Sequence, residues 1–216
     1  MMQMSGQDAA GKYRISKNRV EALVDGIYAF AMTLLVISLT VPVLSKSEAA
    51  ATLATRVFAM HTEFFTFLIA FLVLASFWLV HHRHFHFVRT VNTTLVWINI
   101  YTLAFIVLMP FSTSISGDYP DVQIAVVLFH ANMLIISMFF LIHWHYISHH
   151  PEIMSEPLDL KDAECGTRRS LIVPVVALIG ILVSFITPSY SMAAYLLIPC
   201  GMIVVHHYFC PQEMNR

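Results

Sequence analysis

The stretch RVEALVDGIYAFAMTLLVISLTVP, residues 19–42, is long and apolar enough for a membrane-spanning helix, which needs about 20 such residues. It nevertheless carries Arg19, Glu21, Asp25 and two threonines. A polar group in bilayer hydrocarbon costs several kcal/mol unless it has a partner, so polar groups at this depth usually serve a task. The stretch therefore indicates a spanning helix that does more than anchor the chain.

The composition of the whole chain indicates an integral membrane protein. Of its 216 residues, 58% are apolar and only 12% are charged, and the mean hydropathy is +0.72. A soluble domain is about 25% charged, so this chain has too few charges to solvate a globular surface. The net charge of −1 does not decide whether nucleic acid is a partner, but no basic tract or RNP-like motif indicates one. The three cysteines are far apart, so neither a disulfide framework nor a structural zinc site is predicted.

Six apolar segments are long enough to span a bilayer, which predicts an all-α fold with six transmembrane helices. They cover residues 20–43, 58–80, 93–115, 122–147, 170–187 and 190–209. Pro110 is expected to break or bend the third helix near its outer end. The longest connection, 148–168, is interpreted as a solvated linker that can contain a short interfacial helix. The expected division is a tail at 1–18, a six-helix transmembrane domain at 19–210 and a second tail at 211–216.

Ten of the twelve basic residues fall on one side of a six-span chain. These ten lie in the N-terminal tail, between the second and third helices, between the fourth and fifth helices, and at the C-terminus. Only Lys46 and Arg56 fall on the other side. Because basic loops favour the cytoplasmic side, both termini of this multi-pass protein are expected in the cytoplasm.

Asp25 is the side chain of the first helix that most needs a partner. It cannot reach the interface as Arg19 can, so it is either neutralised by a residue of another helix or protonated. The candidate partners at a matching depth on the second helix are Trp78, His81, His82 and Arg83. Asn99 of the third helix is a further candidate for a bond between helices. These residues can brace the helices or take a direct part in transport, and both interpretations stay open.

Ten of the twelve histidines gather at the cytoplasmic ends of the second, fourth and sixth helices. Two pairs, His82/His86 and His145/His149, have the i, i+4 spacing that can place two imidazoles on one metal ion. They are weak metal candidates, because no carboxylate or cysteine accompanies them in a ligand-like pattern. A headgroup belt formed with neighbouring aromatic residues, or titration near neutral pH, is the alternative role.

Several of these segments resemble a known family. Residues 19–42, with an arginine, Asp-Gly and then Tyr-Ala-Phe-Ala-Met-Thr-Leu-Leu-Val, resemble the first helix of the bacterial and archaeal branch of the transmembrane protein 175 family. That family comprises potassium channels whose animal members sit in endosomes and lysosomes. Residues 77–85 are similar to its Trp-x-x-His-His-x-x-Phe pattern, and Asn99 and residues 110–113 match its third helix. The order and spacing make the combination specific.

The resemblance implies a homotetramer in the lipid bilayer of a bacterial or archaeal cell, with the first helices lining a central pore. It implies no pore loop, and no cofactor apart from the permeant potassium ion. Carried over position by position, the pore constrictions fall on Phe30, Leu34 and Ile37, and a polar ring falls on Thr33. The polar network that braces the first helix in that family falls on Arg19, Asp25, Trp78 and His81.

Two departures from the family pattern affect these expectations. Leu23-Val24 replaces Phe-Ser before the aspartate, which removes a hydroxyl from the network. Phe30 stands at the innermost constriction, where isoleucine is usual. Four phenyl rings around one axis would form a narrower and drier neck, and a hydrophobic constriction can gate by dewetting. Low basal conductance is therefore expected.

The expected function is a potassium-permeable cation channel of the cell inner membrane, with no catalytic residue. Selectivity over sodium is expected to be modest, because the Thr-Val-Gly-Tyr-Gly filter is absent. The alternative is a secondary transporter that moves protons or a divalent metal through Asp25 and the histidines. Missing inverted repeats and a missing helix break at mid-membrane count against it. A third hypothesis is a membrane enzyme that uses an Asp–His pair, but the sequence contains no nucleophile motif to support it.

Overall fold

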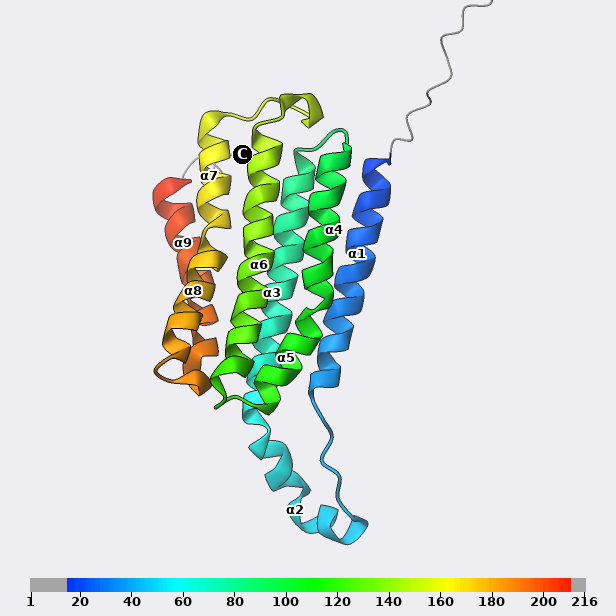
Figure 1. Cartoon of the computed structure of the whole chain (residues 1–216), viewed down its shortest axis with the longest axis vertical. Helices are drawn as coiled ribbons and strands as arrows, with labels where there is room; N and C mark the ends of the chain where they lie inside the picture. Colours follow the sequence, from blue (N-terminus) through cyan, green and yellow to red (C-terminus); the bar gives the residue numbers. More distant parts are fainter. Residues whose placement is uncertain (1–14, 211–216) are drawn as a thin grey trace, which may run out of the picture.

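The computed structural model describes residues 15–210, in which six segments are long and apolar enough to cross a membrane. In Figure 1 the long helices stand side by side along the long axis of the molecule. The predicted number and order of spans are confirmed. Most of the expected tail at 1–18 and all of the tail at 211–216 lie outside the described residues. The six segments are Lys17–Ser38, His61–His86, Thr93–Asp118, Gln123–Ser148, Leu160–Ser184 and Pro188–Phe209.

The first span is shorter than its predicted range of 20–43. It consists of α1 (Lys17–Leu34) and a tighter 3₁₀ turn, η1 (Leu35–Ser38). Leu39 already has extended backbone angles, with φ −92° and ψ 93°. Pro42 disfavours helical angles at the residue before it, so the apolar residues that follow Ser38 leave the helix. The span therefore ends at Ser38.

The outer connection contains a helix that was not predicted, α2 (Lys46–Ala59). It begins with a capping box, in which the Ser45 hydroxyl accepts from the Glu48 N–H and the Glu48 carboxylate accepts from the Ser45 N–H. The Ser45 hydroxyl also donates to the Glu48 carboxylate, and this bond together with the one from the Ser45 N–H lowers the pKa of the Glu48 carboxyl. No residue of α2 is buried, and the helix projects beyond one end of the bundle (Figure 1).

The second and third spans follow the predicted pattern. The second is the single helix α3 (His61–His86), and the third is divided into α4 (Thr93–Val107) and α5 (Met109–Asp118). Leu108 lies between the two parts, and Pro110 is in the first turn of α5. Proline is tolerated there because the first N–H groups of a helix have no partner within it. The predicted break at Pro110 is confirmed.

The fourth span is α6 (Gln123–Ser148), and the fifth begins earlier than its predicted start at residue 170. After the short turn η2 (Pro151–Ile153), α7 (Leu160–Ser170) runs almost directly into α8 (Ile172–Ser184). The second half of the presumed linker 148–168 is therefore the start of the fifth span. Pro174 has no N–H to bond the Ser170 carbonyl, which accounts for the interruption between α7 and α8.

The sixth span consists of a long 3₁₀ segment, η3 (Pro188–Leu196), followed by α9 (Leu197–Phe209). The predicted turn at 187–190 is thus the start of the 3₁₀ segment. Side chains of α1, α3, α4, α6, α8 and η3 form one apolar core. Its fully buried members include Tyr28, Leu74, Ile106, Phe129 and Met133. Phe77 and Phe140 stack within it, with ring centroids 5.0 Å apart.

The basic residues keep the separation that the sequence indicates. We call the end of the bundle that carries the start of α1, the α3–α4 connection and α7 the basic end. Lys46 and Arg56 lie on α2 at the opposite end. The placement of both termini in the cytoplasm depends on this separation and stays a prediction. The described basic residues of the basic end are Lys17, Arg19, Arg83, Arg89, Lys161, Arg168 and Arg169.

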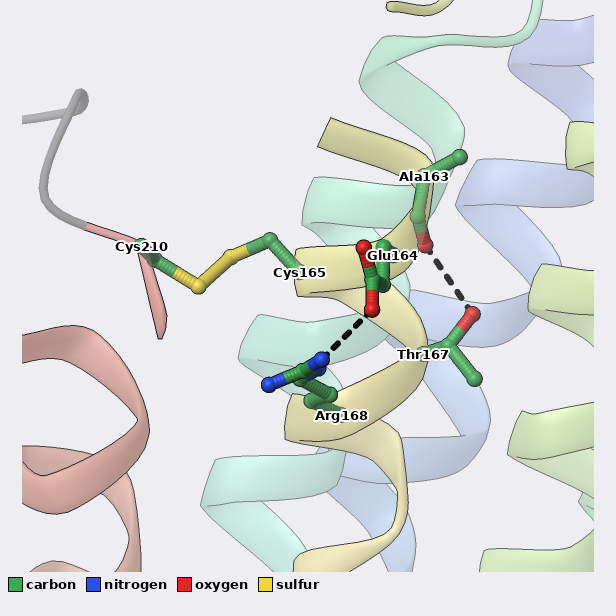
Figure 2. A network of polar contacts seen from close by, with 6 residues as sticks. All are labelled: Ala163, Glu164, Cys165, Thr167, Arg168 and Cys210. Atoms are coloured by element: carbon green, nitrogen blue, oxygen red, sulfur yellow. Dashed lines mark hydrogen bonds and ion pairs between the residues drawn. A yellow bond between two sulfur atoms is a disulfide. The ribbon is translucent and has the colours of Figure 1, made fainter. Parts of the chain in front are cut away.

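A disulfide joins Cys165 of α7 to Cys210, directly after α9, so the expectation of unpaired cysteines was wrong (Figure 2). The two residues are 45 positions apart in the chain, and their Cα atoms are 5.8 Å apart. The turn between α8 and α9 brings the two ends together. The Arg168 guanidinium lies 4.3 Å from the centroid of the Phe209 ring, and it also pairs with the Glu164 carboxylate. The remaining cysteine, Cys200, is a free and exposed thiol.

Thiol counting tests this disulfide. Free thiols are blocked with N-ethylmaleimide at lysis in denaturant, and the chain is then reduced and labelled with a polyethylene-glycol maleimide. We expect two adducts per wild-type chain, because only the bonded pair escapes the block. Cys200→Ser is the matched control and should still carry two, whereas Cys165→Ser should carry none. A wild-type chain without adducts would show that the pair is reduced in the cell.

Candidate functional site

The predicted pore residues lie on the face of the first span that does not pack against the bundle, with Ile37 in η1 and the others in α1. Phe30 is 62% exposed and Ile37 is 69% exposed. Thr33 is also exposed, and Leu34 is half-buried beside it. The helix lies at the edge of the bundle in Figure 1. A chain with this arrangement presents an apolar strip with one hydroxyl, about two helical turns long, to whatever lies next to α1.

The opposite face of α1 packs against α3, α4 and α5. Its side chains are almost completely buried and recur at three- and four-residue spacing. Since α1 is apolar on both faces, periodicity alone does not separate the two stripes. The structure separates them by burial. The buried stripe consists of Val20, Val24, Tyr28, Ala31 and Leu35.

The Thr33 hydroxyl is satisfied as a donor by its own helix. Its Oγ1 lies 2.7 Å from the Ala29 carbonyl oxygen and 2.8 Å from the Phe30 carbonyl oxygen. One hydroxyl proton is shared by these two acceptors, so the lone pairs of the oxygen stay available on the exposed face. Thr33 can therefore offer an oxygen to a cation or to the water around it without breaking the helix.

Asp25 finds the partner that the sequence indicates. The indole Nε1 of Trp78 on α3 donates to Asp25 Oδ1 at 2.8 Å, which ties the basic end of α1 to α3. A cavity of about 200 Å³ lies beside this bond and is lined by Glu21, Asp25, His81 and His82. Arg19 does not join the predicted network, because it is exposed and the structure gives it no hydrogen bond or ion pair within residues 15–210.

The other two network residues belong to a buried chain of hydrogen bonds. Asn99 Nδ2 donates to the Leu95 carbonyl at 2.8 Å, which turns Asn99 Oδ1 toward His81 Nε2 at 2.7 Å. His81 therefore carries its proton on Nε2. Asn99 Nδ2 also lies 3.4 Å from His143 Nε2, and His143 Nδ1 lies 3.0 Å from His84 Nδ1. His143 thus accepts through Nε2 and donates through Nδ1.

The histidines of the basic end fall into two sets that the sequence does not distinguish. His81, His84 and His143 are at most 6% exposed, so they form part of the helix packing and not a headgroup belt. His145 and His149 lie on the surface, with ring centroids 4.1 Å apart. His149 Nδ1 donates to the His145 carbonyl, which removes that nitrogen as a metal ligand.

The proposed i, i+4 metal pairs gain no further ligands. His82 and His86 are exposed on α3. Within residues 15–210, no three side chains of histidine, cysteine, aspartate or glutamate come together as a metal site.

His130 is a buried polar residue that the sequence analysis passed over. Ser191 Oγ donates to the Pro188 carbonyl at 2.6 Å, so it accepts from His130 Nε2 at 2.9 Å, and His130 Nδ1 then accepts from Tyr195 at 3.0 Å. The ring also packs on Gly180 of α8, where a Cβ would come within 2.6 Å of it. The sequence held one signal of this site, since His130 is a single histidine among the apolar residues of a predicted span.

Comparisons with known proteins find similar potassium channels. The family model "Endosomal/lysosomal potassium channel TMEM175" matches residues 19–110, which contain the exposed strip of α1, Trp78, His81 and Asn99. A potassium channel of Chamaesiphon minutus is 25% identical over 172 residues, which is 78% of this chain and 84% of that protein. Over residues 19–110 this chain is therefore similar to the TMEM175 family. A potassium channel of a Chryseobacterium species is 26% identical over 184 residues, or 85% of this chain and 91% of that protein.

The fold is shared as well. The crystal structure of a lysosomal potassium-selective channel TMEM175 homolog from Chamaesiphon minutus superposes with a TM-score of 0.74. It is 22% identical in sequence, and the match covers 88% of this chain and 97% of that chain. At this identity the match establishes the six-helix fold. The named relatives are channels, so the family gives no reason to search for catalytic residues or a cofactor.

Substitution of Asn99 tests the buried chain of hydrogen bonds. Asn99→Leu leaves His81 Nε2 and His143 Nε2 without their partner, which we expect to cost about 1–3 kcal/mol of stability. For a chain of this size, each kcal/mol lowers the melting temperature by about 2–4 °C. The measurement is the melting temperature of the purified protein in detergent.

The matched control is Thr102→Val on the same helix. It removes only a hydroxyl that bonds its own helix, at 2.8 Å from the Ile98 carbonyl. If both substitutions lower the melting temperature equally, Asn99 does not link the histidines in the way described.

Proposed function

We propose that this protein is the subunit of a potassium-permeable cation channel in which α1 of each of four identical subunits lines the pore. The observation that carries the proposal is the unpacked strip of α1, with Phe30, Thr33 and Ile37 exposed in the single chain. The potassium channels among its relatives support the choice of ion.

The order of the side chains supports a hydrophobic neck with a polar ring beside it. Counted from the basic end, Phe30 comes before Thr33 on the exposed strip, and Leu34 and Ile37 follow. Rings of apolar side chains exclude water and ions from the neck until it widens. The threonine oxygens can then coordinate an ion that has passed through the neck. The cytoplasm then lies at the basic end, and the transmembrane channel domain extends over residues 19–210.

The brace between α1 and α3 supports the neck mechanically. The Trp78–Asp25 bond fixes α1 about one and a half turns before Phe30, and the buried stripe of α1 fixes its rotation. A pore wall needs such support, because a small rotation of α1 about its axis would turn the exposed strip away from the pore and bring the adjacent side chains of the helix there instead. In this proposal Asp25 is a structural residue and does not carry the permeant ion.

Replacing Phe30 with alanine tests the neck. In proteoliposomes, Phe30→Ala should raise potassium flux by about tenfold or more, which corresponds to a barrier lowered by about 1.4 kcal/mol. Phe185→Ala is the control, because Phe185 is similarly exposed at 69% but follows α8, away from α1. Equal flux in the wild-type protein and Phe30→Ala would remove Phe30 from the gate. Saturable, proton-coupled uptake of zinc without a potassium current would favour the transporter instead.

The number of subunits is tested separately. Light scattering of the purified protein in detergent, corrected for the bound detergent, should give four chains per particle over a range of concentrations. We expect four chains because the apolar strips of four α1 helices can pack together around one axis and so avoid contact with detergent. A monomer at every concentration would leave the strip of α1 facing detergent, and a shared pore would be impossible.

A further inference from the structure

Two neighbouring cavities of the single chain lie on the side of the bundle away from α1. The first, of about 290 Å³, lies at the basic end between α3, α6 and α7. The second, of about 170 Å³, lies between α3, α6, α8 and α9. Val80, Arg169 and Ser170 line both cavities. The two cavities are therefore adjacent across this shared wall, and we call them together the α3–α7 cleft.

The chemistry of the α3–α7 cleft changes along its length. The outer cavity has charged walls, with Arg83, Arg169, Asp159 and Asp162 among its lining residues. The inner cavity is lined mainly by apolar side chains, including Phe77, Phe140, Val173, Ile198 and Met202. Along α3 the step from Arg83 to Phe77 is about 9 Å, or nearly two helical turns. That is the depth over which a bilayer changes from headgroups to hydrocarbon.

The walls of the cleft are fixed by specific contacts. Gly166 of α7 packs flat against Trp144 of α6, where a Cβ would come within 2.2 Å of the indole ring. Trp144 Nε1 donates to the Ala163 carbonyl at 3.0 Å, and the Cys165–Cys210 disulfide fastens the other side of α7 (Figure 2). The cleft therefore lies between helices that are held at a set separation.

Arg169 stands where the charged and apolar parts of the cleft meet. Its Nη2 donates to His206 Nδ1 of α9 at 3.1 Å, which positions the guanidinium group at the junction. A guanidinium group has five N–H donors, and phosphate oxygens suit its geometry. Asp159 and Asp162, farther out in the same cavity, suit a primary ammonium group with N–H donors of its own.

We propose that the α3–α7 cleft binds a glycerophospholipid with an ethanolamine headgroup from the leaflet at the basic end. The phosphate lies against Arg169, the ammonium lies between Asp159 and Asp162, and part of one acyl chain fills the inner cavity. A choline headgroup has no N–H donors for the two carboxylates. A glycerol headgroup has no positive charge for them. The charges of the cleft therefore select a zwitterion with a primary amine.

Native mass spectrometry of the full-length protein tests this proposal. The delipidated protein in detergent is titrated with phosphatidylethanolamine, phosphatidylcholine or phosphatidylglycerol carrying identical acyl chains. We expect saturable binding of phosphatidylethanolamine, about tenfold tighter than the other two, as the loss of one charge-assisted hydrogen bond would give. Equal binding of all three lipids would overturn the proposed headgroup recognition.

Variants locate the site. Val173→Trp fills the inner cavity and should weaken phosphatidylethanolamine binding about tenfold or more. Val175→Trp is the matched control, because Val175 is 51% exposed on the same helix and is not part of the cleft lining. Equal binding by the two variants would show that the lipid lies elsewhere.

A surface variant keeps the test valid if Val173→Trp does not fold. Asp159→Asn combined with Asp162→Asn should abolish the preference for ethanolamine over glycerol headgroups while the protein still elutes like the wild type. A preserved preference in this variant would overturn the assignment of the ammonium site.

Discussion

The pairing of polar groups inside the bilayer is the constraint on which this structure depends. The Asn99 side chain satisfies this constraint with three hydrogen bonds, to the Leu95 carbonyl of its own helix, to His81 of α3 and to His143 of α6. Three spans are thereby held in one register at the basic end. None of these groups can leave the arrangement without exposing a buried donor or acceptor to hydrocarbon, where the cost is high. His130 applies the same rule nearer the opposite end, with partners from η3.

These interior bonds explain why α1 can remain at the edge of the bundle. The spans that carry the buried histidines hold together through their own side chains, and α1 adds one packed stripe and the bond from Trp78 to Asp25. The remaining face of α1 is then left unpacked in the single chain, and the proposed tetramer would place it at the pore. The polar network and the apolar strip therefore have different tasks, since one fixes the position of the helix and the other forms the surface that the helix presents.

Much of the fold could be predicted, because length, hydropathy and the distribution of charge report directly on membrane spans. The break at Pro110 and the partner of Asp25 also followed from residue chemistry. The start of α7 was missed because its polar residues look like a loop when it is judged by hydropathy alone. The capping box at Ser45 and Glu48 was a visible signal for α2, but an exposed helix outside the membrane has no apolar stripe to draw attention.

The candidate site was predictable only in part for a physical reason. A helix that is apolar all round has no periodicity that distinguishes its packed face from its free face, so the roles of Phe30 and Tyr28 came from resemblance and from burial, respectively. Pairing between distant residues was equally hidden. Cys165 and Cys210 meet because of the turn between α8 and α9, and His130 meets Tyr195 because of the 3₁₀ segment, and neither leaves a local pattern in the sequence.

The disulfide gives the last quarter of the chain an unusual topology. Cys165 and Cys210 close α8, η3, α9 and the end of α7 into a covalent ring. While that bond is intact, a protease that cuts once between the two cysteines opens the ring but releases no fragment. The two pieces would separate only after reduction. The final hairpin of this membrane protein is thus joined to the rest of the chain by two independent covalent connections.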